Sequence, residues 1–316
     1  MTYICRLNEP TGNSFSQAFR LPPVWNGLPL AAYGQWLPSQ PLSTHTRRTY
    51  LTQVKQYCTY LSTFPWEYGH PLQEPHARDY AVRDYKTALK VLHLAKPSSV
   101  NLALAAVDHF YRFLELPTPQ VTREDLPAQA PRALEPSEQK RFLRAVERCS
   151  SARDRAIALL LFYTGLRISE CASLTMDDVR LSSRKGLVIV RMGKGNTYRE
   201  VPLNAEVRTA LDNWLEQRKQ RVSQRNELAL FLTKRGTRLA TRSIDDVVRR
   251  LGQEANLSLS AHILRHTCLT SLVRHGNDLV LVAELAGHKR LETTRRYSLP
   301  TAADREAAME GLKVDY

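Results

Sequence analysis

The longest apolar run of the chain opens the stretch Ala156-Ile-Ala-Leu-Leu-Leu-Phe-Tyr-Thr-Gly-Leu-Arg-Ile-Ser-Glu170. The run predicts a buried helix, which Gly165 interrupts. Arg167 follows this break and precedes Glu170 by three residues. A half-buried arginine needs an anionic partner, so Glu170 can hold Arg167 in place while its outer donors face a ligand. For this segment alone, an internal ion pair without further function is the other interpretation.

The apolar pattern predicts a mainly α fold in two domains, which suits a length of 316 residues. Five prolines and three glycines before residue 40 indicate an irregular N-terminal arm over residues 1–42. A helical domain is expected over residues 43–116, because apolar residues recur there at three- and four-residue steps. The proline-bearing stretch 117–135 indicates a linker with a hinge, and residues 136–316 form the second domain.

The second domain is expected to be helical around one small β-hairpin. Two β-rich runs, Leu187–Met192 and Tyr198–Leu203, are joined by Gly193-Lys-Gly-Asn196, which puts Lys194 at the hairpin tip. The expected helices of this domain are residues 136–149, 153–163, 204–221, 242–255, 260–275, 278–286 and 301–312.

The chain is strongly basic, with 45 Lys and Arg against 31 Asp and Glu and a formal net charge of +14. Residues 1–130 hold 12 basic and 9 acidic residues, and the rest hold 33 and 22, so the second part carries most of the charge. Arginine outnumbers lysine by 34 to 11, and the guanidinium fork matches phosphate oxygens. The expected partner is a polyanion, most simply nucleic acid. A basic surface that only aids solubility is the alternative.

Composition and motifs argue against several other classes of protein. The longest apolar run is far shorter than the roughly 20 residues that span a bilayer. The N-terminus lacks the layout of a signal peptide, so we expect a soluble, cytoplasmic protein. Five scattered cysteines without a Cys-x-x-Cys pair indicate buried free thiols, not disulfides or a zinc site.

A second group of polar residues lies on the expected helix that begins near Ser260, a candidate N-cap. His262 and Arg265 share one face near the positive end of the helix dipole, which attracts phosphate. His262 and His266 also have a metal-ligand spacing, but Ile263 stands where a zinc protease has its glutamate, and no third ligand follows. We therefore expect no metal, and each histidine alone could be a hydrogen-bonded core residue.

Two further candidates follow Gly287. His288 comes directly after this glycine, and Tyr297 follows two arginines. A phenol ionises near pH 10, so Tyr297 would need nearby cations to act as a nucleophile, and packing is its other interpretation. With two arginines, two histidines and Lys194, this tyrosine completes the set that metal-free phosphoryl transfer on DNA requires. Guanidinium and imidazole donors can stabilise the extra negative charge of the pentavalent transition state.

The chain resembles the tyrosine recombinase, or phage-integrase-like, family of site-specific recombinases in four pieces that occur in family order. The pieces are Thr164-Gly-Leu-Arg-Ile-Ser-Glu170, Gly193-Lys-Gly-Asn196, His262-Ile-Leu-Arg-His266, and Gly287-His288 followed nine residues later by Tyr297. Any one piece is weak, but the ordered set overrides the structural interpretations given above for single residues. The resemblance covers about residues 43–312, and the arm before it has no counterpart.

The resemblance implies a role for each of these residues. Four groups would bind and polarise the scissile phosphate: Arg167, Arg265, His262 and His288. Lys194 would be the general acid for the leaving 5′ hydroxyl, Tyr297 the nucleophile, and Glu170 a support of the site. Because a 3′-phosphotyrosyl intermediate retains the bond energy, no metal, ATP or other cofactor is implied.

The family also implies a C-shaped, two-domain clamp on duplex DNA, with a helical core-binding domain, a catalytic domain and a C-terminal helix that docks on a neighbouring subunit. The partners would be a specific DNA site with inverted repeats, three further copies in a synaptic tetramer that forms a Holliday junction, and an accessory DNA-bending protein. Arg47, Arg48 and Arg242 are candidate DNA contacts, and each can equally be a solvated surface charge. The task would be integration and excision, or resolution of a mobile element, plasmid or chromosome dimer, on the nucleoid.

Two other functions are open on this evidence. A type IB topoisomerase uses a similar residue set to relax supercoils without exchanging strands. A non-catalytic DNA-binding regulator would keep the fold, although it has no need for Tyr297 together with Lys194.

Overall fold

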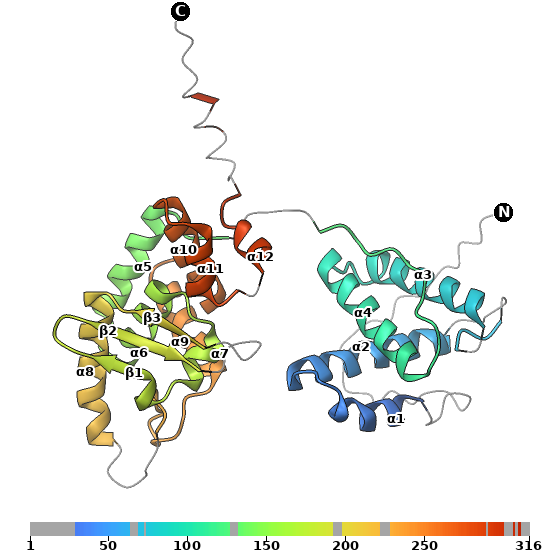
Figure 1. The fold of residues 1–316 in the computed structure, drawn as a ribbon, viewed down its shortest axis with the longest axis horizontal. Coiled ribbons are helices and arrows are strands. Elements are labelled where there is room, and N and C mark those ends of the chain that lie inside the picture. Colours follow the sequence, from blue (N-terminus) through green and yellow to red (C-terminus); the bar gives the residue numbers. More distant parts are fainter. Residues whose placement is uncertain are drawn as a thin grey trace, which may run out of the picture. The chain divides into compact units, whose positions relative to one another are not determined.

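The computed structural model describes residues 29–63, 69–72, 74–126, 132–191, 198–221, 228–288, 290–299, 306 and 309–310. Over these residues the chain is mainly helical, and it separates into two compact units, residues 1–127 and 128–316 (Figure 1). Each unit has its own buried core. None of the helices within the described ranges is long and apolar enough to cross a membrane.

The first unit packs its helices around aromatic and small apolar side chains. Its described elements are α1 (Pro29–Trp36), the 3-10 turn η2 (Leu37–Ser39), α2 (Thr44–Thr63), α3 (Pro75–Val91) and α4 (Pro97–Phe113). Tyr57 on α2 and Tyr111 on α4 are both fully buried, and their hydroxyls are 2.9 Å apart. This bond joins the two helices, and it offsets the cost of removing the two hydroxyls from water.

The expectation of an irregular arm over residues 1–42 is wrong from Pro29 onward, where α1 begins. Proline suits the first turn of a helix, because an N–H at that position has no intrahelical partner. Tyr33 and Leu37 are 0% and 2% exposed and pack in one cluster with Val54 and Phe110. Burial of these side chains outweighs the local signal of proline and glycine. Residues 1–28 lie outside the described residues.

The linker expected over residues 117–135 is too long. Residues 117–126 have no regular structure, yet they are bonded to the first unit: Arg78 Nη1 donates to the Pro117 carbonyl at 2.8 Å, and Asn101 Nδ2 donates to the Glu124 carbonyl at 2.8 Å. At the other end, Leu134 belongs to the core of the second unit. Proline removes helical structure but not packing, so composition alone overestimates the free length.

The second unit is built around a central helix. Its described elements are α5 (Pro136–Arg148), α6 (Ala152–Thr164), α7 (Ile168–Ser173), the 3-10 turn η3 (Met176–Asp178), β1 (Val179–Leu181), β2 (Gly186–Val190), β3 (Arg199–Pro202), α8 (Ala205–Arg221), α9 (Thr241–Glu254), α10 (Ala261–Arg274), α11 (Leu279–Ala286) and α12 (Leu291–Arg295). Helix α6 is buried along almost its whole length and contacts α5, α7, α8, α9 and α10. The apolar run noted in the sequence is therefore the centre of this core.

The ends of α6 are set by local chemistry. Ser151 caps its N-terminus by accepting the Asp154 N–H, and Gly165 ends it with φ +60°. This left-handed conformation is costly for residues with a side chain. The helix ends at this point although Leu166 remains in the core, and Arg167 follows as the N-cap residue of α7.

The strands form one antiparallel sheet in the order β1-β2-β3. Val188 pairs with Val201 and Val190 with Arg199, which confirms the expected pairing of the two β-rich runs. Strand β1 and helices α7 and α12 were not expected, because each is too short to show a period. The hairpin tip, residues 192–197 with Lys194, lies outside the described residues. Of the helix expected at 301–312, only residues 306, 309 and 310 are described, and they are helical.

Candidate active site

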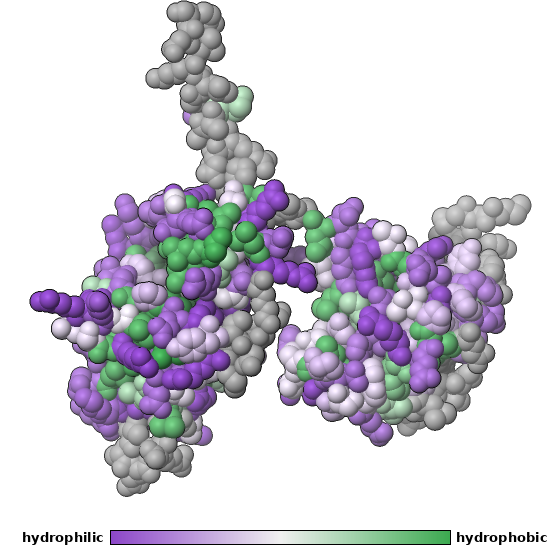
Figure 2. Space-filling model, in the orientation of Figure 1, coloured by the Kyte–Doolittle hydropathy of each residue, from purple (hydrophilic) through white to green (hydrophobic). Residues whose placement is uncertain are grey.

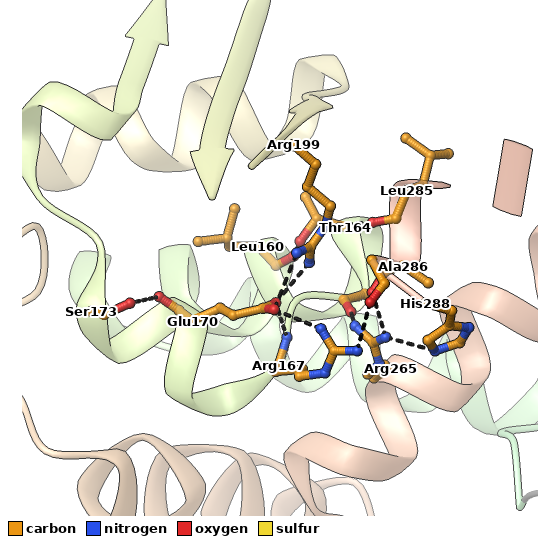
Figure 3. A network of polar contacts seen from close by, with 12 residues as sticks. Leu160, Thr164, Arg167, Glu170, Ser173, Arg199, Arg265, Leu285, Ala286 and His288 are labelled. Carbon is orange, nitrogen blue, oxygen red and sulfur yellow. Dashed lines mark hydrogen bonds and ion pairs between the residues drawn. The ribbon is translucent and has the colours of Figure 1, made fainter. Parts of the chain in front are cut away.

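Glu170 lies at the centre of a network of polar contacts in the second unit (Figure 3). Its carboxylate is 2% exposed and accepts hydrogen bonds from the Arg167 N–H at 2.8 Å and from Arg167 Nη1 at 2.7 Å. Burial alone would raise the pKa of this carboxyl, but hydrogen bonds from Arg199 and Arg167 outweigh burial and hold the pKa below its usual range. Glu170 is therefore a buried anion that fixes two cations.

Arg199 is the residue of this network that the sequence reasoning missed. Its Nη1 and Nη2 donate to the two oxygens of Glu170, and its Nε donates to the Leu285 carbonyl at 2.9 Å. Arg199 and Val201 lie on the buried face of β3, and Glu200 between them is exposed. An arginine on the inward face of a strand was the available signal, because such a charge requires a buried partner.

Arg167 connects this network to the turn after α11. Its Nη2 donates to the Gly287 carbonyl at 3.1 Å, and its side chain is 23% exposed. Gly287 has φ +63°, and a Cβ built on it would lie 2.8 Å from Arg199 Nη1. Both the backbone conformation and the space at this turn thus require glycine.

Arg265, on α10, is the most buried of the expected phosphate-binding groups. It is 4% exposed, and it donates to the Gly165 carbonyl through Nη1 and to the Ala286 carbonyl through Nη2 at 2.7 Å. Burial, and then the charge of Arg167, lower the pKa of Arg265 to about 10, so the guanidinium stays charged at neutral pH. The two glycine breaks expected from the sequence thus supply carbonyls that orient the arginines.

His288 lies beside Arg265. Arg265 Nη2 is 3.0 Å from His288 Nε2, and His288 Nδ1 is 2.8 Å from Thr294 Oγ1. A guanidinium only donates, so Nε2 accepts and the ring carries its proton on Nδ1. Burial, and then the nearby arginines, lower the pKa of His288 to about 4. An anion bound beside these groups would favour the protonated ring and let Nε2 donate.

Tyr297 completes the site. It is 5% exposed, its ring is parallel to that of His288, and its hydroxyl is 3.0 Å from His266 Nδ1. Burial raises the pKa of the phenol above its ordinary value, although Arg265 and Arg296 act in the opposite direction. The nucleophile candidate is thus held among cations in its neutral form.

His262 and His266 form a pair one helical turn apart on α10, with their Nε2 atoms 2.7 Å apart. Burial, and then the charge of Arg265, lower the pKa of His262. His262 is exposed and His266 is buried. The two histidines have the sequence spacing of metal ligands, but in the structure their rings contact each other directly.

The structure therefore brings Arg167, Glu170, His262, Arg265, His288 and Tyr297 into one continuous site. Three other candidates are outside this network. Arg47 is half-buried and donates from Nη2 to the Gln40 carbonyl at 2.8 Å, whereas Arg48 and Arg242 are exposed at the starts of α2 and α9. Cys58, Cys149, Cys171 and Cys268 are buried free thiols, as expected for them, and Cys5 lies outside the described residues.

This arrangement is suited to bind a phosphate diester next to a phenol. Guanidinium groups whose positions are set by carbonyls and a buried carboxylate need no reorganisation when negative charge develops. The described residues contain no group of three or more His, Cys, Asp or Glu side chains that could hold a metal ion.

Comparison with protein-family models matches both units of the chain. Residues 132–303 match the phage integrase family, and residues 31–116 match the N-terminal SAM-like domain of phage integrases. Together these two matches cover the chain except for residues 1–30, 117–131 and 304–316.

Comparison with individual proteins agrees with these matches. The tyrosine recombinase XerA of Thermococcus kodakarensis is 32% identical over 288 residues, which cover 88% of this chain and 93% of that relative. A crystal structure of a XerA recombinase is 27% identical with a TM-score of 0.51, over 91% of this chain and 99% of that one. The XerH recombinase bound to a palindromic difH substrate has the same fold, with a TM-score of 0.71 at 20% identity over 89% of this chain and 84% of that one.

Proposed function

The chain belongs to the phage integrase family of tyrosine recombinases, and we propose that it cleaves and rejoins specific DNA sites through a 3′-phosphotyrosyl intermediate. The observation that carries this proposal is the convergence of two arginines, two histidines and the buried Tyr297 hydroxyl around one site. A phenol held among cations is what attack on a phosphate diester requires, because the cations stabilise both the phenolate and the transition state.

Each residue has a distinct role in the proposed reaction. Arg167 and Arg265 bind the scissile phosphate, and His262 and His288 donate to its oxygens as negative charge develops. Tyr297 attacks phosphorus, and Lys194 protonates the leaving 5′ oxygen. A 5′ hydroxyl of the partner strand then attacks the phosphotyrosine, so the number of phosphodiester bonds is unchanged.

The proposed assembly is a synaptic tetramer that exchanges strands through a Holliday junction within the cytoplasm. Exposed apolar side chains on two contacting helices support a subunit interface: Val280 and Leu281 on α11 and Leu291 on α12 are 62%, 45% and 46% exposed. Figure 2 shows hydrophobic surface in the upper part of the second unit. Grouped apolar side chains on a surface are typical of protein–protein contacts. Arg47, Arg48 and Arg242 are the proposed contacts to the DNA backbone, and an accessory DNA-bending protein is a further proposed partner.

The experiment uses the Tyr297→Phe variant to select binding sites from a random-sequence duplex library. Nicked duplexes that carry the selected sites are then incubated with wild-type protein in excess EDTA. We expect a covalent protein–DNA adduct with the wild type and none with Tyr297→Phe, which should bind as tightly. An adduct of equal yield with the variant would contradict the assignment of the nucleophile.

The same proteins and selected DNA sites distinguish a recombinase from a topoisomerase and from a DNA-binding regulator. Relaxation of plasmids that lack a selected site, without recombinant products, would indicate a type IB topoisomerase activity. Tight binding by the wild type without any adduct would indicate a DNA-binding regulator.

A further inference from the structure

The hydroxyl of Tyr297 contacts a histidine that is not among the expected catalytic residues. His266 Nδ1 is 3.0 Å from the Tyr297 oxygen, and the two side chains are 6% and 5% exposed. His266 follows Arg265 directly on α10, so the turn of the helix places it beside the phenol on the inner side of the site. Of the three histidines of the site, His266 is therefore the one whose ring nitrogen contacts the Tyr297 hydroxyl.

A second contact continues this line outward. His266 Nε2 is 2.7 Å from His262 Nε2, which requires that one nitrogen carry a proton and the other accept it. His262 is one turn closer to the helix N-terminus and is exposed. A continuous path of hydrogen bonds thus runs from the buried Tyr297 hydroxyl through two imidazoles to the surface.

Positive charge surrounds this path. Burial, and then His262, Arg296, Arg265 and His288, lower the pKa of His266 to about 3. These neighbours come from α10, from the turn after α11 and from the end of α12, and each disfavours an imidazolium. His266 is therefore neutral at pH 7, with one N–H and one free acceptor nitrogen.

We propose that His266 is a catalytic residue, the base that receives the Tyr297 proton and passes its own Nε2 proton to His262. The proposal rests on the proposed function, because it concerns the step in which Tyr297 attacks phosphorus. It makes His266 one link of a two-histidine relay. In this relay His262 passes its Nδ1 proton to water instead of donating it to the phosphate, and Arg167, Arg265 and His288 keep their phosphate contacts.

The relay moves three protons and leaves both imidazole rings neutral. Before attack, Tyr297 donates its O–H to His266 Nδ1, His266 donates its Nε2–H to His262 Nε2, and His262 carries a proton on Nδ1. When the P–O bond to Tyr297 forms, its proton moves to His266 Nδ1, the Nε2 proton moves to His262, and the Nδ1 proton of His262 leaves to water. Both rings end neutral, as the other tautomer, and one proton is released. Religation runs the same steps in reverse.

A relay explains a conflict that a single base leaves unexplained. Burial raises the pKa of Tyr297, so the phenol needs a base, yet the arginines make a charged imidazole costly at this place. Two neutral rings that exchange tautomers meet both conditions, because neither has to hold a net charge. Solvent access at His262 supplies the exit for the proton.

The kinetic test compares His266→Asn with the wild type on the nicked duplexes selected as above. Asparagine can accept from the Tyr297 hydroxyl but has no second nitrogen that reaches His262. We expect unchanged DNA affinity, adduct formation slower by about 100-fold at pH 7, and a rate that rises about tenfold per pH unit up to pH 9. His275→Asn is the matched control, because His275 is exposed at the far end of α10 and bonds only the Ser271 carbonyl among the described contacts.

Equal rates and equal pH profiles for His266→Asn and wild type would overturn the relay while leaving the nucleophile assignment intact. Absence of an adduct with the wild type would instead overturn the proposed function itself, and the relay with it. A measurement on the wild-type protein tests which ring nitrogen of His266 carries the proton. In ¹⁵N NMR spectra of the free protein we expect His266 to be protonated on Nε2 only, and a ring protonated on Nδ1 would contradict the proposal.

Discussion

Arg199 and Glu170 form a two-pronged ion pair, with Nη1 and Nη2 of the arginine 3.1 and 2.7 Å from the two carboxylate oxygens. Both residues are almost fully buried, and both contact groups of the site: Glu170 orients Arg167, and Arg199 donates to the Leu285 carbonyl before the turn that carries His288. The pair therefore fixes the distance between two segments that are far apart in the sequence.

The first prediction concerns Arg199 as a positioning residue. Arg199→Lys keeps the charge but loses the planar fork, so Arg167 and His288 should shift relative to each other. We expect DNA binding close to wild type and adduct formation slower by about 100-fold, the effect of a small misplacement of reacting groups. The measurement is the adduct rate on selected nicked duplexes, well below the melting temperature of the variant.

The matched control is Arg153→Lys. Arg153 also bonds one carboxylate and one carbonyl, those of Asp154 and Leu232, but it lies at the start of α6, away from the site. It should lower thermal stability without slowing the reaction of the folded protein. If both variants reduce the adduct rate alike, Arg199 has only a structural role.

The second prediction compares two glycines that share a left-handed backbone. Gly287 has φ +63° and Gly276 has φ +78°, but only Gly287 has Arg199 within reach of an added Cβ. Alanine at either position should cost about 1 kcal/mol or more in backbone strain. Gly287→Ala should also displace Arg199 and slow the adduct reaction at least tenfold, whereas Gly276→Ala should not. Equal adduct rates for the two variants would show that the contact with Arg199 is unimportant.

The third prediction concerns stability in acid. In the unfolded chain His266 takes up a proton near pH 6.5, whereas in the folded protein its pKa is about 3. The folded state thus binds fewer protons between these values, so the free energy of unfolding should decrease as the pH falls below 6.5. At pH 5 the loss due to this residue is about 2 kcal/mol. Urea unfolding at pH 7 and pH 5 should show that loss in the wild type and in His275→Asn, and less of it in His266→Asn.

The fourth prediction concerns the basic surface. Arg48 and Arg242 are exposed, and each is expected to neutralise one phosphate. Replacing either with alanine should weaken binding to all duplexes and reduce the slope of log K against log salt by about 0.9. Fluorescence anisotropy over a series of salt concentrations measures both quantities. A change confined to the selected site would instead indicate base readout at that arginine.

Local pattern was sufficient for most of the long helices, and together with the order of the motifs it supplied the candidate residues of the site. Periods of three to four residues and the breaks at Gly165 and Gly287 are properties of neighbouring residues, and they placed Arg167 and His288 directly after helix ends. Each motif residue taken alone also has a structural interpretation, such as packing for Tyr297 or an internal ion pair for Glu170. The order of the four motifs along the chain is what made Tyr297, Arg265 and Glu170 candidates.

Tertiary structure decided which groups distant in the sequence contact each other, whereas the local pair of Arg167 and Glu170 was expected from its spacing. The bond between Arg199 and Glu170 joins residues 29 positions apart, and that between His266 and Tyr297 joins residues 31 apart, so no local period could reveal either. The same reason explains the error at Pro29, where burial of Tyr33 and Leu37 against other helices forms α1 in spite of its composition. Sequence determined which polar and ionisable groups the chain carries, and long-range packing determined which of them contact each other.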